Sequence, residues 1–366
     1  MSRRPGIWVI FLVLVVIVAI FDASRHGDHQ DFDNGSHGAH IPVKLLVAPE
    51  SGFGGYVEKT PVHSISAEWR VPTILRDSTD GSAATWIGVQ GPDSAFIQVG
   101  TEENTEKGGV GSQYRVFWSD TVENFHPHAV MTVSPGDLIG ASLVHLGTKW
   151  HIQVEDLTTR EIGPVLIGYS NKLTFDAGEW IQEDPVEDPT SGFDASYPSL
   201  SNVSFQRLRV NGHVPHLDFN DASALSTLAG RSYVPSTVVD DGFVLRRAAG
   251  AQLQYLSDVY PLNLGLNYLF DEVNNAEMPS TYAFTNLYSQ FSTLNAKVLV
   301  QHWPASVARL IAQFRTLNAR AEQGLRAWQD GSTSDQTQLK NNYFADVKAV
   351  SNVGHLIRTR LGLPPA

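Results

Sequence analysis

The spacing of apolar residues changes once along the chain, and this change is what most constrains the fold. From residue 42 to about residue 225, short runs rich in Val, Ile, Thr, Phe and Trp recur between turn signals, with no helical pattern between them. Regular spacing of this kind predicts an antiparallel sandwich or barrel. The predicted strands span residues 63–71, 83–89, 95–100, 114–118, 129–133, 138–146, 149–156, 165–169 and 202–210.

From residue 250 onward the apolar residues follow helical spacing instead. One set comprises Phe284, Leu287, Tyr288, Phe291, Leu294 and Val298, and two further sets follow between Val307 and Ile357. This period predicts a unit of three or four helices. We therefore expect a β domain over residues 42–230 and a mostly helical C-terminal domain over residues 231–366. The helical domain carries no catalytic motif. One hypothesis makes it an assembly or substrate-recruiting unit at a membrane.

Four arginines lie along the second predicted helix. They are Arg309, Arg315, Arg320 and Arg326. A solvated helix face is the simpler interpretation, and a stripe that binds a membrane or a partner is the alternative.

The N-terminus predicts export. Arg3 and Arg4 precede an unbroken apolar run over residues 7–21, which fits the core of a signal peptide or a short membrane anchor. We assign residues 1–24 to this segment and residues 25–41, rich in His, Asp and Gly, to a flexible linker. In both interpretations the rest of the chain is secreted, or membrane-anchored through an uncleaved N-terminus, with its β domain outside the cytoplasm.

Composition excludes several chemistries. The chain has no cysteine, so thiol catalysis, disulfide scaffolds and cysteine-based metal sites are ruled out. Its net charge is −12, and residues 42–230 carry 24 Asp and Glu against 11 Lys and Arg. This charge disfavours nucleic acid as a partner, because phosphate binding requires a basic surface. A surplus of carboxylates suits work in acid, and it suits simple solubility equally well.

Local motifs for common catalytic sites are absent. The sequence holds no GxSxG, P-loop, HExxH or dinucleotide fingerprint. His126 and His128 have the spacing that places two imidazoles on one strand face, yet no third metal ligand is evident. We interpret two acidic pairs, at residues 183–184 and 187–188, as parts of a polar loop. Calcium binding is the alternative. We predict no metal site and no cofactor.

A series of short segments in fixed order carries more information. They are SAEWRVP at residues 66–72, ATWIGVQG at 84–91, FIQVGT at 96–101, VSPGD at 133–137 and AGEWIQED at 177–184. Together they resemble the eqolisin, or glutamic peptidase, family over roughly residues 62–210. The resemblance implies a two-sheet antiparallel β-sandwich of the concanavalin-like type, in agreement with the strand pattern.

The resemblance implies a catalytic pair made of Gln98 and Glu179. Glu179 as carboxylate would take a proton from a water that attacks the scissile carbonyl, and would return it to the leaving amine. The amide of Gln98 would donate a hydrogen bond to the developing oxyanion. Without the resemblance, both residues would read as ordinary polar residues on strands.

The remaining predicted site residues are assigned to substrate binding. They are Trp86, Trp69, Gln90, Tyr114 and Trp118. Two positions depart from the family pattern: Gln90 stands where the family has an aspartate, and Ser119 stands where it has a glutamate. These departures put the pKa of Glu179 and the shape of the substrate cleft in question.

We therefore expect an exported or membrane-anchored acid endopeptidase that hydrolyses polypeptides with a Glu/Gln dyad. The alternative is a non-catalytic sandwich module that binds carbohydrate or protein at the cell surface, with Trp69, Trp86, Trp118 or Trp180 stacking on sugars.

Overall fold

The structure is a computed structural model. It describes residues 50–78, 80–91, 95–105, 111–122, 126–170, 175–185, 197–275, 279–332 and 334–365. The predicted signal or anchor over residues 1–24 and the linker over residues 25–41 lie outside the described residues. Within the described ranges, no helix has both the length and the apolar character needed to cross a bilayer.

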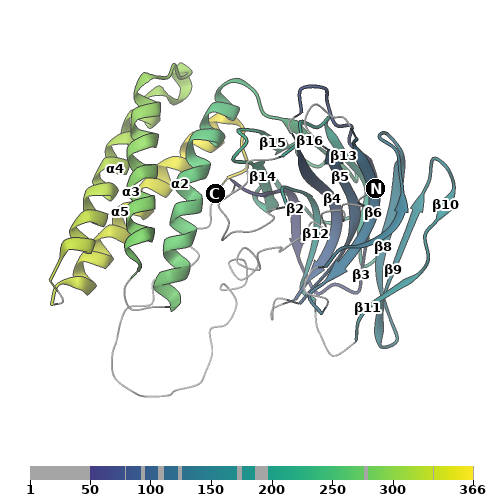
Figure 1. Cartoon of the computed structure of the whole chain (residues 1–366). Helices are drawn as coiled ribbons and strands as arrows, with labels where there is room; N and C mark the ends of the chain where they lie inside the picture. Colours follow the sequence, from purple (N-terminus) through teal and green to yellow (C-terminus); the bar gives the residue numbers. More distant parts are fainter. Residues whose placement is uncertain are drawn as a thin grey trace, which may run out of the picture. The chain divides into compact units, whose positions relative to one another are not determined.

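The described strands pair antiparallel in one continuous path that folds into two layers (Figure 1). Sheet A follows the order β10-β9-β8-β3-β13-β16-β15, with β11 also paired to β9, and sheet B follows the order β2-β12-β4-β5-β6-β7. Strand β14 pairs with both β15 and β2, so it joins the two sheets, and β1 pairs with β14.

The strand bounds are β1 Glu50–Ser51, β2 Phe53–Lys59, β3 Ser64–Arg70, β4 Gly81–Gln90, β5 Phe96–Thr105, β6 Gln113–Asp120, β7 His128–Thr132, β8 Leu138–Leu146, β9 Lys149–Asp156, β10 Glu161–Ile162, β11 Leu166–Ser170, β12 Ala177–Glu183, β13 Val203–Val210, β14 Ala222–Ser226, β15 Ser232–Pro235 and β16 Phe243–Arg247. A short 3₁₀ turn, η4 Phe219–Asp221, precedes β14.

Alternating side chains place the hydrophobic core between the sheets. In β3, Ile65 and Trp69 are buried while Ser66 and Glu68 between them are partly exposed, as a half-buried strand requires. Sheet B contributes residues such as Ile87, and all three apolar residues belong to one core cluster. The predicted mainly antiparallel β architecture with a C-terminal helical part is confirmed.

The described chain divides into two compact units, Ser51–Arg247 and Ala248–Ala366. The strands continue beyond residue 230, because β15 and β16 complete sheet A. Tyr233 on β15 and Leu245 on β16 are both fully buried, which ties these strands to the sandwich core.

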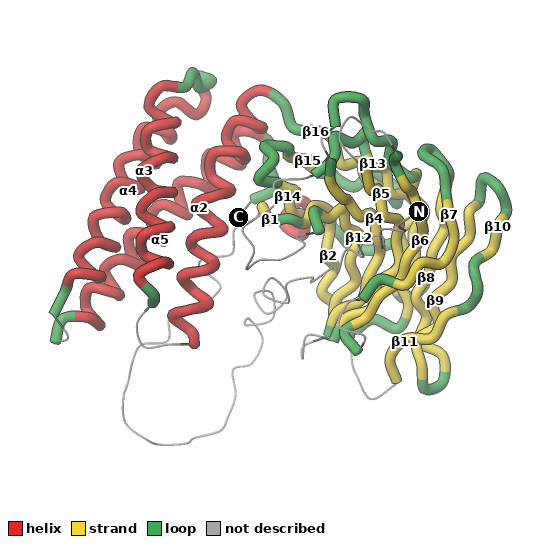
Figure 2. Tube along the Cα trace, viewed as in Figure 1, coloured by secondary structure: helices red, strands yellow, loops and turns green. Residues whose placement is uncertain are grey.

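The second unit is built from four described helices, shown in red in Figure 2. They are α2 Gly250–Asn275, α3 Thr281–Val300, α4 Ala305–Asp330 and α5 Gln336–Leu361. Trp328 of α4 packs edge-on against Phe284 of α3, with 5.2 Å between the ring centroids, and both side chains are buried. Pro304 is the N-cap of α4, a position where proline is tolerated.

The N-cap of α5 is Asp335, which makes no side-chain capping bond. Of the four arginines on α4, Arg320 pairs with Asp346 at 2.6 Å and Arg326 pairs with Glu322 at 2.9 Å. The choice between a solvated face and a binding stripe stays open.

Candidate active site

Glu179, Gly88 and Gln98 lie opposite one another on three neighbouring strands of sheet B and form one cross-strand row. In the register of the strands, Glu179 on β12 pairs with Gly88 on β4, and Gly88 pairs with Gln98 on β5. Side chains paired across neighbouring strands point to the same face of a sheet. Two strand spacings separate the Cα atoms of Glu179 and Gln98 by roughly 10 Å. Gly88 has no side chain, and the rings of Trp86 and Phe96 pack over it between the carboxyl and the amide.

The carboxyl group of Glu179 is buried without a hydrogen bond from any described residue. Only 8% of the residue is exposed. Burial raises the pKa of Glu179 to about 7, because removing water penalises the charged form. A carboxyl group with a pKa in this range takes up and releases protons near neutral pH, as a general acid or base requires.

The amide of Gln98 is held by one neighbour and has unused hydrogen-bonding capacity. Its Nε2 donates to the hydroxyl of Ser119 at 2.8 Å, and Ser119 continues the same row on β6. A primary amide carries two N–H donors, so one remains beyond the bond to Ser119. The Oε1 atom of Gln98 is buried with no partner. An orphaned acceptor next to a spare donor is suited to bind a water or a peptide group.

A second row, two residues along the strands, is apolar. It contains Ile181, Trp86, Gly100 and Phe117. The ring of Trp86 packs edge-on against Phe96 at 5.3 Å between centroids. A Cβ atom at Gly88 would lie 2.8 Å from Cζ3 of Trp86, so the glycine leaves the space that this ring occupies.

A third row carries two more buried carboxyl groups. Glu183 lies opposite Ala84, and Ala84 lies opposite Glu102. Glu183 accepts a hydrogen bond from the indole N–H of Trp86 at 2.7 Å, and burial raises its pKa to about 8. Glu102 forms an ion pair with Arg115. The sequence interpretation missed this row because it placed Glu183 in a polar loop. The signal was available in the spacing, since residues 179, 181 and 183 share one face of a strand.

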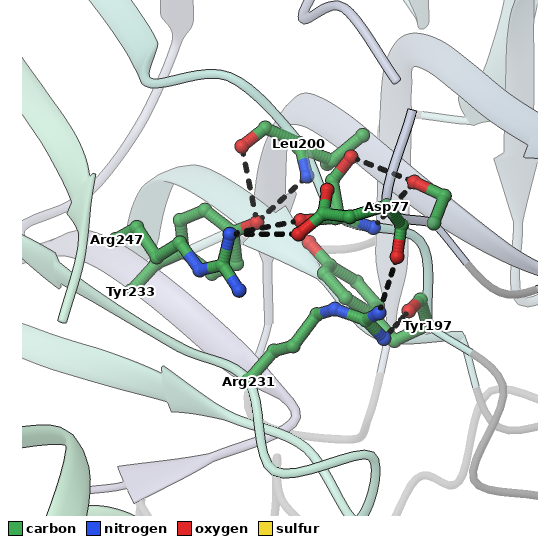
Figure 3. A network of polar contacts seen from close by, with 8 residues as sticks. Asp77, Tyr197, Leu200, Arg231, Tyr233 and Arg247 are labelled. Atoms are coloured by element: carbon green, nitrogen blue, oxygen red, sulfur yellow. Dashed lines mark hydrogen bonds and ion pairs between the residues drawn. The ribbon is translucent and has the colours of Figure 1, made fainter. Parts of the chain in front are cut away.

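The opposite face of β12 is fastened to the sandwich by polar contacts. Gln182 donates to the hydroxyl of Tyr197 at 3.0 Å. The carbonyl oxygen of Tyr197 in turn accepts from Arg231 (Figure 3). The hydroxyl of Tyr233 holds the same segment by accepting from the backbone N–H of Leu200 at 2.8 Å (Figure 3). These contacts fix the position of the strand that carries Glu179.

The structure brings some of the predicted site residues together and separates others. Trp86 and Gln90 share the face that carries Glu179 and Gln98, because residues 86, 88 and 90 alternate to the same side of β4. Trp69 lies elsewhere: it is fully buried in the core on sheet A, and its indole N–H donates to Thr101 at 3.1 Å.

Tyr114 and Trp118 also point away from the Glu179 face. They sit at even positions of β6, whereas Ser119 sits at an odd position, and both pack against the sandwich core. Tyr114 accepts a hydrogen bond from the backbone N–H of Ile74, and Trp118 stacks on His128 with 4.8 Å between ring centroids. The structure thus places Trp69, Tyr114 and Trp118 in packing positions off the Glu179 face, and the substrate-binding role assigned to them stays a prediction.

The two histidines considered for a metal lie side by side. The rings of His126 and His128 are 5.4 Å apart, and in the described part of the chain no group of three His, Asp or Glu side chains gathers at a possible metal position. Of the acidic residues considered for calcium, Glu187 and Asp188 lie outside the described residues.

Neither a protein-family model nor a curated protein matches the sequence. Several solved structures are similar to part of the chain, among them three structures of glutamic peptidases. Two are scytalidoglutamic peptidase with a peptide-based transition state analog and with a transition state analog inhibitor, each at 20% identity, covering 54% of this chain and 98% of that chain, with TM-scores of 0.43 and 0.41. The third is aspergilloglutamic peptidase from Aspergillus niger, at 19% identity and a TM-score of 0.34, covering 46% of this chain and 100% of that chain. The similarity is low in every case.

Proposed function

We propose that the protein is a peptide hydrolase in which Glu179 activates a water molecule and Gln98 stabilises the oxyanion. The observation that carries the proposal is the row on sheet B: a buried carboxyl with a pKa of about 7, a bare glycine, and an amide with a spare donor and an orphaned acceptor. The low similarity to glutamic peptidases adds no weight to it.

The reaction uses only groups of this row and one water. The carboxylate of Glu179 takes a proton from the water while the water oxygen attacks the carbonyl carbon of the peptide. The spare N–H of Gln98 donates to the oxygen that becomes negatively charged. The Glu179 carboxyl then gives its proton to the nitrogen as the C–N bond breaks, which yields a carboxylic acid and an amine and restores the Glu179 carboxylate.

The raised pKa of Glu179 changes the expected pH range. At pH 5 only about 1% of a carboxyl group with a pKa of about 7 is ionised. Because the first step needs the carboxylate, the rate is expected to rise between pH 5 and 7. This differs from the acid optimum that composition and family resemblance favoured.

The cellular location stays part of the proposal. Arg3, Arg4 and the apolar run over residues 7–21 support export, with cleavage of the segment or retention as an anchor. A polypeptide outside the cytoplasm is then the proposed substrate.

Sugar stacking on the tryptophans, the alternative drawn from the sequence, loses most of its basis. Trp69, Trp86 and Trp180 are each no more than 1% exposed, so their faces are not available to a sugar ring. Trp118 is partly buried and already stacked on His128.

The test is proteolysis of casein by the full-length protein from pH 3 to 8, beside Glu179→Gln and Gln98→Ala. We expect a loss of about 10²–10⁴-fold for Glu179→Gln and about 10²–10³-fold for Gln98→Ala. The matched controls are Glu161→Gln and Gln113→Ala, which change the same residue types at exposed positions and should keep full activity. A folded but inert wild-type protein, or variants as active as wild type, would overturn the proposal.

A further inference from the structure

Sheet A carries a groove that the proposed peptidase site does not use. Its volume is about 500 Å³, within the range of small-ligand sites. It lies on the outer face of the sheet, where Ser66 and Glu68 of β3 alternate with the buried residues of the sandwich core. Glu179 and Gln98 belong to sheet B, so the two sites are on different sheets.

Polar residues line the groove in two rows across four strands. The first row is Arg209, Ser66, Ser142 and Gln153, and the second row is Glu68, Gly140 and Glu155. Gln206 pairs with Glu68 in the register and lies behind the lining. Gly140 lies directly between Glu68 and Glu155 in the register, and the side chain of Leu157 packs over it. The rows therefore line the groove with hydrogen-bond donors and acceptors from neighbouring strands.

A β-bulge shapes one wall of the groove. The pairing of β13 with β3 shifts by one residue between Gln206 and Arg209, and Arg207 within the shift has a φ of 52°. A non-glycine residue in this left-handed region is strained, and such strain collects at functional positions. The bulge directs the guanidinium of Arg207 onto Glu68, whose second oxygen accepts from Gln206 at 2.9 Å.

The charges that line the groove are already matched. Glu68 pairs with Arg207 at 2.8 Å, Arg209 pairs with Asp241 at 2.8 Å, and Glu155 lies 3.7 Å from Arg160. A charged ligand would have to displace one of these pairs, whereas a neutral ligand rich in hydroxyl groups would add hydrogen bonds to them. Oriented carboxylates accept from hydroxyl groups, and guanidinium groups donate to them.

The rim of the groove supplies apolar contact. Ile162 is 74% exposed and Val165 is 52% exposed, and both line the groove together with Leu157. Exposed aliphatic residues beside a polar groove match a ligand with both C–H and O–H surfaces, such as a sugar ring.

We propose that this groove on sheet A binds a neutral oligosaccharide. Glu68, held by Gln206 and Arg207, accepts hydrogen bonds from its hydroxyl groups, while Gln153 and Ser142 bind its other end. An extended polypeptide is the rival occupant. A polypeptide fits less well, because its regularly spaced backbone N–H and C=O groups would face side chains of mixed type.

The test is binding of the full-length protein to an array of neutral hexose and N-acetylhexosamine oligosaccharides, followed by calorimetric titration with the strongest binder. We expect Gln153→Ala to weaken binding about fivefold and Glu68→Gln at least tenfold, reflecting a lost neutral and a lost charged hydrogen bond. Gln113→Ala, an exposed glutamine on β6, is the matched control and should stay within twofold of wild type. Glu179→Gln should bind as wild type does, which separates this site from the peptidase site.

Three results would overturn the proposal. They are no binding anywhere on the array, binding that is unchanged by both groove variants, and binding in the groove of unmodified casein peptides in preference to every oligosaccharide. Thermal unfolding of each variant checks its fold. Because Gln153 is exposed, Gln153→Ala keeps the test decisive even where Glu68→Gln perturbs the bulge.

Discussion

The amide nitrogen of Gln98 lies 2.8 Å from the hydroxyl oxygen of Ser119, and both side chains are buried on one face of sheet B. This bond fixes the plane of the amide, which sets the direction of the second N–H. Ser119 is a neutral contact of Gln98. It supplies an acceptor for the amide without adding a fourth carboxyl group near Glu179, Glu183 and Glu102.

Removing the hydroxyl tests this role. Ser119→Ala should lower kcat about fivefold, the equivalent of one neutral hydrogen bond of about 1 kcal/mol, because Gln98 loses its fixed orientation. KM should change little, since the serine is fully buried. Ser134→Ala changes an exposed serine in a turn and serves as the control. A loss in KM alone would show that Ser119 shapes binding rather than the oxyanion donor.

Gly88 predicts a steric limit on the site. A Cβ atom there would lie 2.8 Å from Trp86 and 3.0 Å from Phe96, so Gly88→Ala forces these rings apart. We expect a destabilisation of about 1–3 kcal/mol, typical of overpacking. Activity should fall as well, because displacing these rings disturbs the row that holds Glu179 and Gln98. Urea unfolding and casein hydrolysis measure the two effects, and a variant as stable and active as wild type would contradict the geometry.

Stability should decrease as the pH rises through neutrality. Burial raises the folded-state pKa of Glu179 to about 7, of Asp184 to about 7 and of Glu183 to about 8. In the unfolded chain these groups ionise near their ordinary values of about 4. Between these limits the folded state holds more protons than the unfolded state, so the free energy of unfolding falls with rising pH.

The measurement is the Tm of the full-length protein from pH 5 to 8. We expect a steady fall across this range and a shallower one in Glu183→Gln, which removes one of the titrating groups. The exposed Glu161→Gln should follow wild type. A Tm that rises from pH 5 to 8 would show that these carboxyl groups are ionised in the folded protein.

Glu103 forms a buried polar chain on the core side of sheet B. Thr101 donates to one oxygen of Glu103 at 2.7 Å, and the hydroxyl of Thr85 lies 3.4 Å from the other. The single proton of the Thr85 hydroxyl goes to Gln182 at 2.6 Å, so the contact with Glu103 needs a proton on the carboxyl. Burial raises the pKa of Glu103 well above its ordinary value, in agreement with a neutral group.

A neutral Glu103 predicts different outcomes for two substitutions. Glu103→Gln supplies one donor and one acceptor in the same shape and should change the free energy of unfolding by less than about 1 kcal/mol. Glu103→Ala leaves the Thr101 hydroxyl without its acceptor and creates a cavity, at a cost of about 3 kcal/mol. Denaturant unfolding compares the two, and a loss in Glu103→Gln as large as in Glu103→Ala would mean that the group is charged.

The sequence predicted elements best where apolar and polar residues alternate. Strands β3, β8 and β9 follow the period of two closely and were predicted near their observed bounds. Strand β12 shows no alternation, because all of its residues are buried. Strand β2 carries two glycines, Gly54 and Gly55, directly after its first residue. The spacing of apolar residues therefore did not predict either strand, and both are defined by their pairing in the sheet.

The candidate site could be predicted only in part, for a related reason. A period of two tells which residues of one strand share a face, but it does not tell which strands are neighbours. The pairing of β12 with β4 and of β4 with β5 brings Glu179 and Gln98 to one row. The same register sends Trp118 to the core side and leaves Ser119 beside Gln98, which local sequence alone does not reveal.

The most direct test of the central claim is the pH dependence of kcat/KM for one peptide substrate, measured with the full-length wild type and Glu179→Gln. The account predicts a rate that rises with pH to an apparent pKa of about 7 in the wild type, and a residual rate without this ascending limb in the variant. A wild-type rate that falls between pH 5 and 7, or an unchanged profile in Glu179→Gln, would contradict the assignment of Glu179 as the base.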